Sequence, residues 1–186
     1  MRILAASKNR KISEIKKIHQ EGILLFGENY VQEAFNKIQT YKELKIELHL
    51  IGKLQKNKIN KALDIFDCIQ TVDSIELAKE INKKNKPIKI MIQVNLTKEP
   101  QKNGCSLENL NDLVKECKKL TNISLIGLMF IGKEKNNMDY FKIMKKLQIK
   151  YKLKELSMGM SNDSEDAIKA GSTIIRLGKA LFDSKF

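Results

Sequence analysis

The sequence predicts an α/β fold of the (β/α)8, or TIM-barrel, class. Short apolar runs alternate with longer segments of helical periodicity along the whole chain, and no linker, repeat or low-complexity segment interrupts them. Eight such runs are predicted strands: 3–6, 24–27, 48–51, 68–72, 90–95, 125–131, 156–158 and 174–177. At 186 residues this is a compact single domain, residues 1–186, with short loops.

A doubly wound open sheet is the alternative to the barrel. Its dinucleotide-binding form requires Gly-x-Gly-x-x-Gly after the first strand, where this chain has Ser7-Lys8-Asn9-Arg10. The barrel is therefore favoured.

Amphipathic segments follow the predicted strands. Apolar residues at three- and four-residue spacing predict helices near 12–18, 31–38, 59–66, 75–81, 107–120 and 138–147, and a further helix from about residue 162. Asp73-Ser74 and Asn162-Asp163 lie where helix N-caps belong, and Gly22 and Gly171 lie where helices should end.

Composition limits the classes of function. Hydrophobic residues make up 42% of the chain and the mean hydropathy is −0.36, which is typical of a folded globular protein. No apolar run approaches the roughly 20 residues of a membrane span, and the start of the chain does not resemble a signal peptide. We therefore expect a cytoplasmic protein without a membrane partner.

The net charge of +13 allows two interpretations. A basic balance can indicate nucleic-acid binding, but the lysines are spread over nearly every predicted helix, and the only arginines are Arg2, Arg10 and Arg176. We favour lysines dispersed over the solvent-exposed surface rather than a specific nucleic-acid-binding site.

Cysteine and histidine offer little for metal binding. Cys68, Cys105 and Cys117 have no Cys-x-x-Cys spacing, and His19 and His49 are the only histidines. We expect reduced structural thiols and no metal.

Polar residues follow the carboxyl ends of many predicted strands. These are Lys8, residues 28–30, residues 51–57, Asn95, residues 159–163 and residues 176–178. In a barrel the loops after the strands meet at one end, where active sites lie. We therefore expect these groups to surround one mouth.

Two of these segments predict a phosphate site. Ser157-Met158-Gly159-Met160-Ser161 leads into a predicted helix, and its small residues allow backbone N–H groups to approach an anion at the helix start. Arg176-Leu177-Gly178 supplies the next loop, and phosphate sites in barrels recur after the seventh and eighth strands. The alternative is an ordinary tight turn.

Lys8 at the end of the first strand is a candidate nucleophile. A desolvated amine beside other cations loses affinity for its proton and can form an imine. An imine-forming lysine together with a phosphate site indicates pyridoxal phosphate as the cofactor. A solvated surface lysine is the alternative.

The chain resembles the pyridoxal phosphate homeostasis protein family, single-domain proteins similar to the N-terminal barrel of alanine racemase. The matching stretches cover essentially the whole chain in order: 6–8, 26–33, 49–52, 54–55, 57–58, 71–74, 92–95, 102–104, 127–129, 157–161, 171–173, and positions 176 and 178.

The resemblance implies roles for seven residues. Lys8 matches the lysine that forms the internal aldimine, and Arg176 matches the arginine that faces the pyridine nitrogen. The phosphate-binding positions are Ser157, Ser161 and Gly178, and the ring is lined by Asn29 and by the strand end at residues 49–52, which begins with His49. An arginine in this place leaves the pyridine nitrogen unprotonated, which weakens the ring as an electron sink.

The implied function is therefore binding rather than turnover. We expect a monomeric, non-enzymatic protein that holds pyridoxal 5'-phosphate on Lys8 and acts in its homeostasis as a carrier or buffer, with pyridoxal-phosphate-dependent enzymes as possible recipients. The alternative is a small pyridoxal-phosphate-dependent amino-acid racemase or lyase, for which Tyr30 and Lys102 are the nearest candidates for a second base.

The chain departs from the family pattern near its start. The family's N-terminal helical segment before the first strand is lacking, so we expect some apolar surface to be exposed. The lysine motif continues as Asn9-Arg10-Lys11, where the family commonly has Thr-Lys-Pro.

Overall fold

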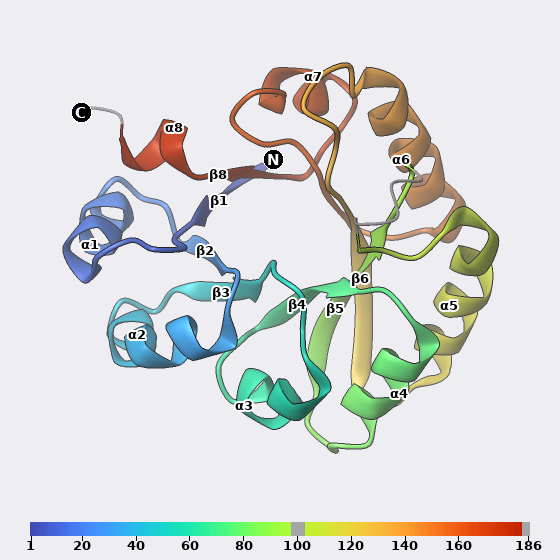
Figure 1. Ribbon diagram of the computed structural model, residues 1–186, viewed down its shortest axis with the longest axis horizontal. Helices are drawn as coiled ribbons and strands as arrows, with labels where there is room; N and C mark the ends of the chain where they lie inside the picture. Colours follow the sequence, from blue (N-terminus) through green and yellow to red (C-terminus); the bar gives the residue numbers. More distant parts are fainter. Residues whose placement is uncertain (98–102, 184–186) are drawn as a thin grey trace.

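The computed structural model describes residues 1–97 and 103–183 as a closed barrel of parallel strands surrounded by helices (Figure 1). Within these residues the strands, in both chain and spatial order, are β1 (Arg2–Ala6), β2 (Leu25–Glu28), β3 (Glu47–Leu50), β4 (Cys68–Val72), β5 (Ile88–Val94), β6 (Ile123–Phe130), β7 (Glu155–Ser157) and β8 (Ile174–Leu177). β1 pairs with β8 and closes the barrel, with Leu4 opposite Arg176. The predicted TIM barrel is confirmed.

The helices lie outside the barrel, as Figure 1 shows. They are α1 (Ile12–Gln20), α2 (Val31–Glu43), the 3₁₀ helix η1 (Lys56–Lys58), α3 (Ile59–Leu63), α4 (Ile75–Asn82), α5 (Leu107–Lys119), α6 (Met138–Tyr151), α7 (Ser164–Lys169) and α8 (Lys179–Phe182).

The helix ends follow the capping residues. The Ser74 hydroxyl accepts the Leu77 N–H at the start of α4, as the sequence predicts. Gly22 and Gly171 have φ values of +88° and +91° just after α1 and α7, the left-handed conformation that ends many helices. The helix predicted over 59–66 is shorter, because α3 ends at Leu63.

Side chains along each strand alternate between two apolar clusters. Leu4 belongs to the small cluster inside the barrel, whereas Ala5 belongs to the larger one between strands and helices. The other buried members of the inner cluster are Leu25, Cys68, Met91, Met129 and Ile174. This alternation also places the residues at the mouth, because alternate positions continue the inner series beyond the strand ends.

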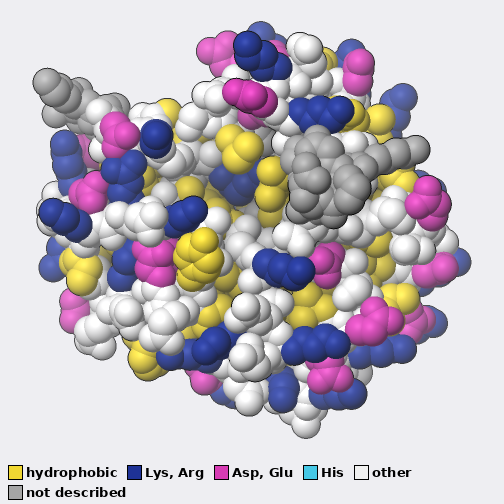
Figure 2. All heavy atoms as spheres, in the orientation of Figure 1, with side chains coloured by type: hydrophobic (Ala, Val, Ile, Leu, Met, Phe, Trp, Pro, Cys, Tyr) yellow, Lys and Arg dark blue, Asp and Glu magenta, His cyan; other side chains and the backbone are white. Residues whose placement is uncertain are grey.

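Lysine and arginine side chains do not form a single stripe on the face seen in Figure 2. They are scattered over it and interspersed with acidic side chains. In residues 1–97 and 103–183, no helix is both long enough and apolar enough to cross a bilayer. The three cysteines are buried free thiols.

Candidate functional site

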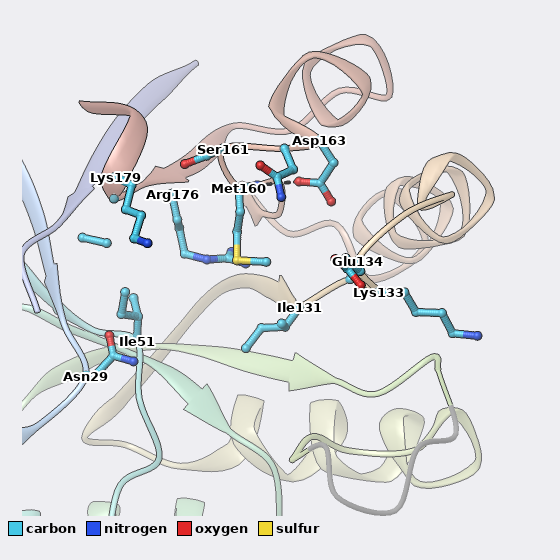
Figure 3. A pocket seen from close by; sticks show the side chains of 14 residues that line it. Asn29, Ile51, Ile131, Lys133, Glu134, Met160, Ser161, Asp163, Arg176 and Lys179 are labelled. Carbon is cyan, nitrogen blue, oxygen red and sulfur yellow. Dashed lines mark hydrogen bonds between the residues drawn. The ribbon is translucent and has the colours of Figure 1, made fainter. Parts of the chain in front are cut away.

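A cavity of about 550 Å³ opens at the carboxyl end of the barrel (Figure 3). Its lining comes from the ends of β1, β2, β3, β6, β7 and β8: Ala6, Asn29, Ile51, Ile131, Gly132, Lys133, Glu134, Met160, Ser161, Asn162, Asp163, Arg176, Gly178 and Lys179. Its size lies within the range of small-molecule sites. The cavity is where the barrel prediction places the site.

Arg176 supplies a buried positive charge to this cavity. The residue is 5% exposed, and its guanidinium donates to the Ser157 hydroxyl at 2.9 Å and to the Phe130 carbonyl at 2.8 Å. Both acceptors are neutral, and no ion pair to Arg176 is found within the described residues. Burial lowers the pKa of Arg176 to about 10, so the side chain stays charged at neutral pH. The cavity wall is therefore suited to an anionic or electron-rich ligand.

The loop after β7 is fixed from both sides. The Asp163 carboxylate accepts the Met160 N–H at 2.6 Å and the Asn137 side-chain amide at 2.7 Å. Gly159 has a φ of +92°, and a Cβ there would collide with Ala167. Among the described residues, the N–H groups of Ser161 and Asn162 have no hydrogen-bond acceptor. These two donors remain available to a ligand.

Lys179 is a second cation at the cavity. It is the first residue of α8 and directly follows Gly178. In Figure 3 its side chain lies on the same side as Arg176, while Asn29 and Ile51 lie opposite. Within the described residues Lys179 forms no ion pair, so its charge is not neutralised by a carboxylate there.

Lys8 lies outside the cavity lining. It is exposed, and its Nζ is 5.7 Å from the centroid of the Tyr30 ring, which is itself 55% exposed. Its backbone continues the inner series of β1, because Ala6, two residues earlier, lines the cavity. The lysine thus stands near the rim of the mouth and is not the desolvated amine that the sequence argument considered.

Two other predicted residues lie below the cavity. His49 is fully buried, with Nε2 3.0 Å from Glu47 Oε1 and Nδ1 2.8 Å from Gln70 Nε2, while Ile51, two residues later, reaches the cavity. Ser157 is fully buried and accepts its hydrogen bond from Arg176.

Of the seven predicted residues, the cavity therefore brings together four: Asn29, Ser161, Arg176 and Gly178. Lys8, His49 and Ser157 are not among its lining residues.

The predicted site includes the strand end at Ile51 and the loop that contains Met160, but it does not include Lys179. Lys179 is one lysine in a lysine-rich chain, although its place after Gly178 was a usable signal. Tyr30, a candidate second base, is exposed beside Lys8 and is not among the residues that line the cavity. Lys102, the other candidate, lies outside the described residues.

Comparisons with known proteins agree with this architecture. Residues 5–185 match the family model described as the N-terminal domain of alanine racemase. The pyridoxal phosphate homeostasis protein of Haemophilus influenzae is 36% identical, over 100% of this chain and 85% of that protein. The protein of the same name from Escherichia coli K12 is 34% identical, over 98% of this chain and 85% of that protein.

Solved structures show the same fold. PipY of Synechococcus elongatus with pyridoxal phosphate bound has a TM-score of 0.89 at 33% identity, covering 98% of this chain and 92% of that one. Alanine racemase from Corynebacterium glutamicum has a TM-score of 0.79 at 13% identity, covering 97% of this chain and 55% of that one, and this likeness concerns the fold alone. Because its sequence is 34–36% identical to these curated relatives over nearly the whole chain, the protein belongs to the pyridoxal phosphate homeostasis protein family.

Proposed function

We propose that this chain binds pyridoxal 5'-phosphate in the cavity, holds it as an imine of Lys8, and acts as a carrier or buffer of the cofactor. The observation that carries the proposal is Arg176, a buried cation that lines the cavity beside the β7 and β8 loops and whose hydrogen-bond acceptors among the described residues are neutral. Family membership and the pyridoxal phosphate bound to PipY support the choice of ligand.

The donor set of the cavity fits this cofactor. Ser161, Gly178 and Lys179 combine a hydroxyl, close backbone approach and a cation, which together suit a phosphate. Ile51 and Met160 supply apolar surface for a ring, and Asn29 supplies an amide at its edge. Arg176 keeps N–H donors for a ring nitrogen, since a guanidinium has five and two bonds are made to the protein.

When bound, the cofactor supplies an aldehyde that condenses with a primary amine. Lys8 would hold the cofactor through its amine, with water released as the C=N bond forms, and a second amine could replace Lys8 by exchange. Lys8 suits this reversible role because its side chain is exposed and its only described side-chain contact is with the Tyr30 ring. Release to pyridoxal-phosphate-dependent enzymes requires no further catalytic group.

Arg176 also explains why we propose binding without turnover. A guanidinium that remains charged at neutral pH donates to a pyridine nitrogen and does not protonate it, so carbanions on the cofactor gain little stabilisation. We further propose that the protein is a cytoplasmic monomer without a specific nucleic-acid or membrane partner.

The decisive experiment is an absorbance titration with pyridoxal phosphate. Wild-type protein and the control variant Lys11→Ala, which removes an exposed lysine nearby, should both develop the band of a protonated imine. Lys8→Ala should not. A band that survives Lys8→Ala and disappears in Lys179→Ala would overturn the assignment, since the amine would then be the lysine inside the cavity.

A small racemase is the second candidate, because Tyr30 stands beside Lys8 at the mouth. Incubation with amino acids in heavy water separates the two functions. We expect at most trace exchange of the α-proton in the wild type and a clear increase in Arg176→Glu, where the ring nitrogen can hold a proton. Rapid exchange by the wild type, abolished in Tyr30→Phe, would support the racemase instead.

A further inference from the structure

We propose that Glu28, Lys37 and Tyr41 form a positioning cluster that fixes the backbone on both sides of Lys8. The inference rests on the proposed function, because it assigns the cluster to the lysine that would hold the cofactor. None of these side chains lines the cavity.

Glu28 is the centre of the cluster. Alternation along β2 turns this fully buried carboxylate away from the barrel interior and towards α2. Its Oε1 accepts the Tyr41 hydroxyl at 2.6 Å, the Lys37 ammonium at 2.9 Å and the Ser7 hydroxyl at 3.0 Å. Burial and the Glu28 charge raise the pKa of Tyr41, so the phenol keeps its proton and remains a donor.

Lys37 connects this centre to the chain around Lys8. Its ammonium donates to the Ser7 carbonyl at 3.0 Å and to Glu33 Oε1 at 2.7 Å. The same Glu33 oxygen accepts the Asn9 N–H at 2.6 Å, where φ is +60°. The residues immediately before and after Lys8 are therefore both bonded to α2.

Lys8 itself differs from its neighbours. Ser7 is fully buried and bonded on both its hydroxyl and its carbonyl, whereas the Lys8 side chain is exposed. A fixed backbone with a free side chain restricts the direction of the amine without blocking its access to a ligand. Such preorganisation lowers the entropy lost when the covalent link forms.

If the cluster served only to stabilise the fold, the charges of Glu28 and Lys37 would not be needed. A buried ion pair is often no more stable than apolar residues of similar volume, because desolvation offsets the attraction. An apolar pair, however, could not bond the Ser7 carbonyl and, through Glu33, the Asn9 N–H. The polar cluster is required for position rather than for stability.

The test compares two ligands on the double variant Glu28→Gln/Lys37→Met, which removes both charges of the pair. Pyridoxal phosphate can form the imine, whereas 4'-deoxypyridoxine 5'-phosphate lacks the aldehyde and reports on the cavity alone. We expect about tenfold weaker binding of pyridoxal phosphate and less than a twofold change for the deoxy compound. Lys42→Met, an exposed lysine on the same helix, should change neither.

Equal losses for both ligands, or no loss for either, would overturn the cluster's positioning role. Glu33→Gln keeps the buried Glu28–Lys37 pair and weakens the bonds of Glu33 to Asn9 and to Lys37, so it provides the same test if the double variant does not fold, with about a threefold loss expected. In a Lys8→Ala background the cluster substitutions should have no further effect. If Lys8→Ala itself leaves pyridoxal phosphate binding unchanged, the proposed function has failed; if only the cluster variants have no effect, this inference alone has failed.

Discussion

Both ends of the barrel carry charged side chains around a cavity, but their partners differ. At the amino end, Arg2 bonds to Glu47 at 2.8 Å and to Glu155 at 3.3 Å, beside a cavity of about 520 Å³. At the carboxyl end, Arg176 bonds to a hydroxyl and a carbonyl beside a cavity of about 550 Å³. Cavity size does not distinguish the two ends, whereas the hydrogen-bond partners of the two arginines do.

The carboxylates of the amino end are also bonded from within the barrel. His49 lies 3.0 Å from Glu47, and the Thr173 hydroxyl donates to Glu155 at 2.6 Å. The hydrogen bond from His49, together with the charges of nearby cations, lowers the pKa of Glu47 to about 2. Arg2, Glu47 and Glu155 therefore satisfy one another without a ligand, although Lys89 and Lys154, which also line this cavity, form no ion pair among the described residues.

At the carboxyl end, the cations that line the cavity form no ion pair in the described part of the chain. The one carboxylate of the β7 loop that lines the cavity, Asp163, accepts from Met160 and Asn137. A buried cation without a counter-ion costs stability, and such costs are typical of functional sites. The comparison agrees with the proposal that the ligand binds at the carboxyl end, where active sites lie in barrels.

The largest expected effect is at Arg176. In Arg176→Met, pyridoxal phosphate should bind about 30- to 100-fold more weakly, a loss of about 2–3 kcal/mol for hydrogen bonds from a charged donor. The free energy of unfolding should change by less than about 1 kcal/mol, because removal of an unpaired buried charge offsets two lost hydrogen bonds. Spectroscopic titration and urea denaturation measure the two quantities. Unchanged affinity for pyridoxal phosphate together with a large fall in the free energy of unfolding would show that Arg176 stabilises the fold and does not bind the ligand.

Glu47→Gln should have the opposite pattern. We expect the free energy of unfolding at pH 7 to fall by about 1–2 kcal/mol, a value reduced for solvent screening, with ligand affinity unchanged. A carboxylate whose folded pKa is depressed stabilises the protein above its ordinary pKa of 4.5, and this contribution disappears as pH falls towards about 2. Urea denaturation between pH 7 and 2 should show that acid-dependent loss in the wild type and a smaller one in the variant. Identical pH profiles would contradict the prediction.

The smallest effect should be at Lys179. At low salt, Lys179→Met should weaken binding of pyridoxal phosphate about three- to fivefold, and the difference should shrink as salt is added. Lys89→Met is the matched control, because Lys89 lines the cavity at the other end. Titrations at two ionic strengths test the pair. An equal effect of both substitutions would show that only the net charge of the protein matters.

The sequence predicted the barrel because its signals are local. Strands buried on both faces require continuous apolar runs, and all eight runs became strands with ends shifted by at most two residues. Asn29, Ser161, Arg176 and Gly178 could be placed together because the ends of parallel strands meet at one mouth. The depth of His49 could not be predicted, since position along a strand does not fix a residue's height in a tilted barrel.

Taken alone, the sequence determined the fold and the end of the barrel at which four of the predicted site residues meet. Only the tertiary structure decided which charges are compensated: Arg2 is paired with Glu155, 153 positions away, whereas Arg176 contacts neutral groups. It also decided that Glu28 faces α2 and anchors Ser7, while Lys8 remains exposed. Apolar periodicity depends on neighbours along the chain, but compensation of charge depends on side chains that meet only when the barrel closes.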